Sequence, residues 1–87
     1  DAILVRDIDW SILGLAPEAF AAYDTAIRHE YQRVPEKRYR FERGEFCRVL
    51  LESKHIFQTP YFRARFEAQA RKNLAGLMKK LGNTPER

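Results

Sequence analysis

The sequence predicts an all-α fold, a small bundle of three main helices preceded by a short N-terminal segment. Two observations predict it. Apolar residues recur mostly three or four positions apart, which is the spacing of one helix face, and most prolines and glycines fall between such stretches. A length of 87 residues with 45% apolar residues allows one small domain, so we expect residues 1–87 to form a single helical unit.

The N-terminal segment, residues 2–13, fits two kinds of structure. Four of its apolar residues share one face of a helix, namely Leu4, Val5, Ile8 and Ile12. The alternation of Ile8, Trp10 and Ile12 suits a strand about equally well. We favour the helix.

A second helix is expected over residues 17–33. Pro17 suits the first helical turn, and Glu18 lies at the positive end of the helix dipole. Its apolar face consists of Phe20, Tyr23, Ile27, Tyr31 and Val34. Pro35 biases the residue before it away from helical geometry, so the helix should end there.

A third helix is expected over residues 36–53, followed by a connector over residues 54–59. Its inner side should carry Tyr39, Phe46, Val49, Leu50 and Ser53. Gly44 costs about 1 kcal/mol relative to alanine inside a helix and is expected to mark a close helix crossing.

The fourth helix should begin at Pro60, with Thr59 as its N-cap. Its apolar stripe consists of Phe62, Phe66, Ala70, Leu74, Leu77, Met78 and Leu81. Gly82 is expected to close this helix, and residues 83–87 should form a frayed tail.

Charge and cysteine content limit the function classes. Sixteen basic residues against twelve acidic residues give a net charge of +4, but acids alternate with bases through most of the chain. With a single cysteine, Cys47, no internal disulfide can form, and no apolar run approaches the roughly 18 residues of a membrane span. We therefore expect a cytoplasmic protein without a membrane partner.

The densest charge run contains seven bases and four acids. The bases are Arg28, Arg33, Lys37, Arg38, Arg40, Arg43 and Arg48. Interleaved Tyr31, Tyr39 and Phe41 would offer stacking surfaces to single-stranded nucleic acid. The mixed charges favour an ordinary surface of two helices, so nucleic acid is the weaker hypothesis. The bases after residue 60 similarly indicate the solvated side of the fourth helix, and they are Arg63, Arg65, Arg71, Lys72, Lys79 and Lys80.

Few side chains are candidates for chemistry. Asp9 lies among apolar neighbours, so it is either buried with a partner or a metal, or it caps a short helix and faces water. Asp7 is two positions away and shares no helix face with it. His29 is expected at a solvated helix position, and Cys47 is expected to be a small core residue.

The first residue, Asp1, is not a methionine, and the chain's only methionine is Met78. An apolar run directly after a free chain end is also unusual. These two observations favour a fragment of a longer protein.

Four segments in order carry a family resemblance that extends over most of the chain. The string Asp7-Ile8-Asp9-Trp10-Ser11-Ile12-Leu13-Gly14 resembles the Asp-x-Asp-x-x-x-Leu-Gly element late in HD-domain metal-dependent phosphohydrolases. The stretches 26–35, 59–60 and 67–74 look like the C-terminal part of predicted HD-superfamily hydrolases.

The resemblance implies a metal site built from a histidine, an adjacent His-Asp pair and a later aspartate, which would be Asp9. The divalent cation would acidify a bound water for attack on a phosphorylated small molecule. This chain contains no His-Asp pair, because His29 precedes Glu30 and His55 precedes Ile56. The other ligands would then lie in the missing N-terminal part of the polypeptide, and the chain alone would be inert.

Two alternatives belong to other classes. One is a small basic nucleic-acid-binding module that uses the run from Arg28 to Arg48, for which binding would weaken steeply with salt. The other is a helical interaction module whose partner covers the apolar segment 3–13.

Overall fold

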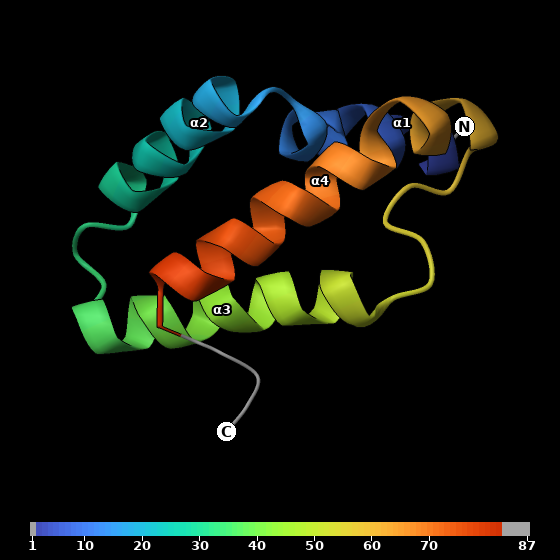
Figure 1. Ribbon diagram of the computed structural model, residues 1–87. Helices are drawn as coiled ribbons and strands as arrows, with labels where there is room; N and C mark the ends of the chain where they lie inside the picture. Colours follow the sequence, from blue (N-terminus) through green and yellow to red (C-terminus); the bar gives the residue numbers. More distant parts are fainter. Residues whose placement is uncertain (1, 83–87) are drawn as a thin grey trace.

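The computed structural model describes residues 2–82, and within them it contains four α-helices and one 3₁₀-helix (Figure 1). The helices are α1 (Ala2–Trp10), η1 (Ser11–Gly14), α2 (Pro17–Glu30), α3 (Glu36–Glu52) and α4 (Pro60–Lys80), where η1 is the 3₁₀-helix. No strand occurs in this range, so the all-α prediction is confirmed there. The expected tail, residues 83–87, lies outside the described residues.

Helix α4 organises the molecule. In Figure 1 it runs between α3 and the N-terminal pair α1 and η1, and it contacts both α3 and η1. The core forms along these contacts from Leu13, Phe20, Cys47, Leu50, Ile56, Phe57, Ala70, Leu74, Leu77 and Met78. Helix α2 lies at the opposite end from the segment 53–59 and buries only Phe20.

The N-terminal segment is helical, as favoured, but its apolar face points outward. Val5 and Ile8 are 54% and 52% exposed, and the buried residue of α1 is Asp7. Trp10, three positions after Asp7, lies on the same inner side. Its ring contacts that of Phe46 in α3 edge-on, with ring centroids 6.5 Å apart. The inner face of α1 therefore holds a carboxylate where an apolar residue is usual.

Two helix ends and one inner position differ from the predictions. Helix α2 ends at Glu30, three residues early, and a turn in which the Val34 N–H donates to the Tyr31 carbonyl leads to Pro35. Helix α3 ends at Glu52. Val49 is 56% exposed because it lies two positions, about 200° of rotation, from the fully buried Cys47.

Helix α4 matches its prediction closely. The Thr59 hydroxyl accepts a hydrogen bond from the Phe62 N–H, which confirms the N-cap, and Gly82 closes the helix at φ +79°. Ala70, Leu74 and Leu77 of the expected stripe are buried.

The contact between η1 and α4 depends on a glycine and an amide. A Cβ added at Gly14 would lie 2.6 Å from the Phe66 carbonyl oxygen, so only glycine allows this approach. Asn73 of α4 donates from Nδ2 to the carbonyls of Leu13 and Leu15, at 2.9 and 2.8 Å. These two bonds satisfy carbonyl groups at the end of η1.

Within residues 2–82, none of the helices combines the length and apolar character that crossing a membrane requires.

Candidate functional site

Asp7 holds the start of α4. Its side chain is 1% exposed. One carboxylate oxygen accepts the Gln58 N–H at 2.9 Å, and the other accepts the Thr59 N–H and hydroxyl at 2.8 and 2.7 Å. A carboxylate that accepts backbone N–H groups at a helix N-terminus is also favoured by the helix dipole. Asp7 thus caps α4 although it lies more than fifty positions away in the sequence.

The environment of Asp7 favours its charged form. Burial alone would raise the pKa of this carboxyl, but the hydrogen bonds from Gln58 and Thr59 outweigh burial and hold the pKa below its ordinary value. The nearby Arg6 guanidinium lowers the pKa further. Asp7 is therefore a charged structural group.

Asp9 lies elsewhere. It is exposed on α1. Of the two alternatives left open by the sequence, the structure agrees with the one in which Asp9 faces water. The buried, partnered carboxylate of this element is Asp7, because a separation of two residues turns the side chains to nearly opposite sides of a helix. A metal-ligand role for Asp9 stays a prediction.

The described residues do not fit a complete metal site. Within residues 2–82 no group of three or more His, Cys, Asp or Glu side chains is placed to hold an ion. One exposed carboxylate is at most a single ligand, whereas protein sites for divalent cations use several.

The other candidates take structural or solvated positions. His29 is exposed on α2, as expected. Cys47 is fully buried, as expected, and burial raises the pKa of its thiol to about 11, so the reactive thiolate is scarce at neutral pH.

Glu67 of α4 is a second structural carboxylate, which the sequence analysis missed. It accepts the Ile56 N–H at 2.9 Å and the Phe57 N–H at 3.0 Å. Burial would raise the pKa of Glu67, but these two bonds and the bond from Arg71 hold the pKa below its ordinary value. Because of this anchoring, Ile56 and Phe57 are fully buried in the core although they belong to the expected connector.

Two of the bases expected on the solvated side of α4 instead bind backbone carbonyls at the end of α3 and in this connector. Arg71 donates to the carbonyl of Leu51 in the last turn of α3 and to that of Ser53 just after it, at 3.0 and 2.9 Å. Arg63 donates to the carbonyls of Phe57 and Gln58, at 3.2 and 3.0 Å. The expectation of solvation is wrong for both, because the connector passes over α4 and its carbonyls need donors.

The basic run of α2 and α3 is largely paired. Arg28 and Arg40 both donate to Glu36, and Arg38 donates to Glu42 at 3.1 Å. Arg48 contacts two carboxylates of α3, at 2.6 and 2.8 Å. Such exposed pairs contribute little stability, but they balance the positive charge that a nucleic acid would bind.

The comparisons with known proteins add no relative. No protein-family model matches the chain, and the searches of curated proteins and of solved structures found no match either.

Proposed function

We propose that this chain is the C-terminal helical portion of a cytoplasmic HD-type metal-dependent phosphohydrolase, to which it contributes Asp9 and part of the wall of the site. The single observation that carries the proposal is the outer face of α1. Val5 and Ile8 are more than half exposed there, and Asp9 is exposed beside them.

The geometry of α1 joins these residues into one surface. Val5 and Asp9 are four positions apart and share a helix face, and Ile8 lies next to both. Apolar side chains gain about 25 cal/mol for each Å² removed from water, so a body that covers Val5 and Ile8 is favoured there. Such a body would lie directly beside Asp9.

The two aspartates of the Asp7-Ile8-Asp9 element would then divide their roles. The hydrogen-bond donors to Asp7, in Gln58 and Thr59, lie at the start of α4, so its carboxylate is committed to the fold. Asp9 is left to a second body. Since residues 2–82 do not form a metal site among themselves, the remaining ligands belong to the N-terminal part of the parent polypeptide in this proposal.

The cation in the parent would acidify water for hydrolysis of a phosphorylated small molecule, which is the chemistry that the resemblance implies. This chain's own contribution is to place one carboxylate on a rigid helix, and alone it should show no turnover. The cytoplasmic assignment agrees with a lone, fully buried Cys47.

The test uses the reading frame extended upstream of Asp1. We expect a histidine followed by a His-Asp pair in the added residues, and one tightly bound divalent ion per chain. Asp9→Asn should weaken metal affinity by at least about 100-fold, since replacing even an outer-shell partner of a ligand costs 10–100-fold. Glu18→Gln is the matched control, because Glu18 is an exposed carboxylate at the start of α2.

An Asp9→Asn protein that keeps both metal and phosphohydrolase activity would contradict the proposal. In the alternative of an interaction module, Val5→Glu and Ile8→Glu would abolish association with the partner, whereas Asp9→Asn would leave every measured activity unchanged.

A further inference from the structure

A groove lies between α2 and α4. Two adjoining cavities form it, with volumes of about 480 and 500 Å³, and residues of both helices line each of them. The cavities share Asp24, Leu77 and Lys80, so they are parts of one surface, which we call the α2–α4 groove. Along α4 it extends from Gln69 to Lys80, which is about 17 Å at about 1.5 Å per residue.

Two lysines of α4 line this groove. Lys72 and Lys80 are eight residues apart and lie on one side of the helix, with their Cα atoms about 12 Å from each other along the axis. Both side chains are exposed. Within residues 2–82 no ion pair involves either of them. The groove therefore carries two separated positive charges that no carboxylate of this part of the chain neutralises.

The groove is open midway between these lysines. Gly76 lines it there, and a Cβ added at this glycine would meet no atom within 4 Å. The neighbouring Leu77 is 5% exposed, and Ala21 of α2 also lines the groove. An apolar side chain brought by a ligand would lose part of its contact with water at this point, which favours binding.

One glutamate that lines the groove is already paired. Glu36 accepts hydrogen bonds from both Arg28 and Arg40, which line the groove as well. Two arginines thus share one glutamate, and this end of the groove also keeps a positive charge.

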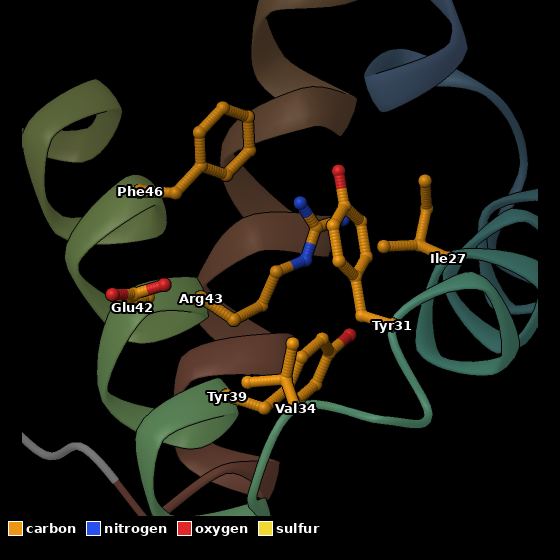
Figure 2. Close-up of a pocket in the computed structure, with 7 residues that line it drawn as sticks. All are labelled: Ile27, Tyr31, Val34, Tyr39, Glu42, Arg43 and Phe46. Atoms are coloured by element: carbon orange, nitrogen blue, oxygen red, sulfur yellow. The ribbon is translucent and has the colours of Figure 1, made fainter.

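The aspartate that lines the groove is paired with an arginine of α3. Oδ1 of Asp24 lies 3.8 Å from Nε of Arg43, and both side chains are mostly buried. Figure 2 shows the Arg43 side chain extending from α3 toward the end of α2, where Tyr31 lies. Because Arg43 offsets the charge of Asp24, neither acid of the groove cancels the charges of the two lysines.

The shape of the groove distinguishes between elongated anions. Its phenyl and phenol rings, those of Phe20 and Tyr39, are 6% and 7% exposed, so neither presents a face on which a base could stack. Side chains at positions i, i+2 and i+4 of an extended peptide point to the same side and span about 13 Å. This length is close to the separation of Lys72 and Lys80, so a peptide fits better than a single-stranded nucleic acid.

We propose that the α2–α4 groove binds an extended acidic peptide segment of a partner protein. Its carboxylates at positions i and i+4 pair with Lys72 and Lys80, and an apolar side chain at position i+2 lies over Gly76. The site is away from Asp9 of α1 and is independent of the proposed phosphohydrolase role.

The test is an NMR titration of the 87-residue chain at low ionic strength, read at the amide resonances of Gly76 and Lys80. The probe is the peptide Glu-Thr-Leu-Thr-Glu with both ends capped. Capped Gln-Thr-Leu-Thr-Gln removes its charge, and capped Leu-Thr-Glu-Glu-Thr keeps its composition and charge but changes the spacing of the acids. We expect the probe to bind at least about fivefold more tightly than either.

Three results of this titration would overturn the proposal. They are equal affinities of the two acidic peptides, the absence of a saturable shift, and tighter binding of a single strand of three thymidines, which carries the same charge as the probe.

Lysine variants locate the charged contacts. Lys72→Gln and Lys80→Gln should each weaken binding of the probe by about threefold, as the loss of one exposed ion pair does. Lys79→Gln is the matched control, because it removes the same charge from an exposed lysine that does not line the groove. Equal losses in all three variants would show a response to net charge alone and would contradict the proposed site.

Gly76→Met fills the groove while leaving the fold intact, since space is open at this glycine and methionine favours helix. It should weaken binding of the probe by at least about tenfold. Ala75→Met is the matched control, because Ala75 is exposed and does not line the groove. Unchanged affinity in the Gly76→Met protein would place the peptide elsewhere and refute the proposal.

Discussion

The side chains of Asp7 and Asp9 have different surroundings because helix geometry turns them to different sides of α1. Both are neighbours of Ile8 in the sequence, but only Asp7 faces α4, where three donors of Gln58 and Thr59 converge on it. Glu67 does the same for the neighbouring residues Ile56 and Phe57. Two carboxylates from distant helices thus fix one short connector, and both depend on staying charged.

Acid should therefore destabilise the fold in a defined direction. The folded-state pKa values of Asp7 and Glu67 lie below their ordinary values, so their contribution is fully present above about pH 5 and is lost as the pH falls through the folded-state values. Urea unfolding at pH 7, 4 and 3 should show falling midpoints. In the Glu67→Gln variant the decrease of the urea midpoint between pH 4 and pH 3 should be smaller than in the unsubstituted protein. An equal loss in both proteins would contradict this assignment.

The sequence could not identify these partners. The separation of Glu67 and Arg71 by four residues is a recognisable ion-pair spacing, but the Leu51 and Ser53 carbonyls that Arg71 also binds lie at the end of α3, which only tertiary packing brings to α4. The partners of Asp7 are more than fifty positions away. Apolar periodicity also predicts the wrong inner face for α1. A helix face can be buried although it contains a carboxylate, provided that the carboxylate is fully hydrogen-bonded.

At the scale of elements, most of the helices could be predicted. Pro17, Thr59 and Pro60 act locally, so the starts of α2 and α4 follow from the sequence. The end of α2 does not, because the turn before Pro35 uses three residues that are compatible with helix. The prediction that Val49 lies on the inner side of α3 is wrong, because α3 has apolar residues on more than one side and the sequence alone does not define which side is buried.

Two glycines provide a matched test of the contact between η1 and α4. Gly14→Ala should destabilise the protein by about 1–3 kcal/mol, because the new methyl group would lie within 3 Å of Phe66. Gly76→Ala should stabilise it by about 0.5–1 kcal/mol, since nothing lies within 4 Å and alanine favours helix. Thermal unfolding measures both changes. Opposite signs for the two variants are expected, and a neutral Gly14→Ala would contradict the close packing.

Across the whole molecule, α2 contributes little to the core. It buries only Phe20, and the two cavities of the α2–α4 groove, of about 480 and 500 Å³, border it. The radius of gyration is 13.2 Å, whereas a compact domain of this length has about 12 Å. The body formed by η1, α3 and α4 thus carries a helix that packs loosely on it.

Hydrogen exchange should reveal this difference. Amides within α2 should exchange at least about tenfold faster than those between Ala70 and Met78 of α4, because elements with few buried contacts open at lower free energy. The α4 segment contains five buried residues and belongs to the core. Uniform protection across α2 and α4 would show instead that the whole molecule opens as one unit.

Asp7 holds the fold, whereas Asp9 is exposed and is proposed to face a second body. Urea unfolding of the Asp7→Asn and Asp9→Asn variants of the 87-residue chain at pH 7 separates these two roles. Asp7→Asn should lose about 3 kcal/mol of unfolding free energy, because an asparagine NH₂ group would face the donors of residues 58 and 59. Asp9→Asn should lose less than about 0.5 kcal/mol, as exposed substitutions usually do. Equal losses, or a larger loss for Asp9→Asn, would contradict the claim.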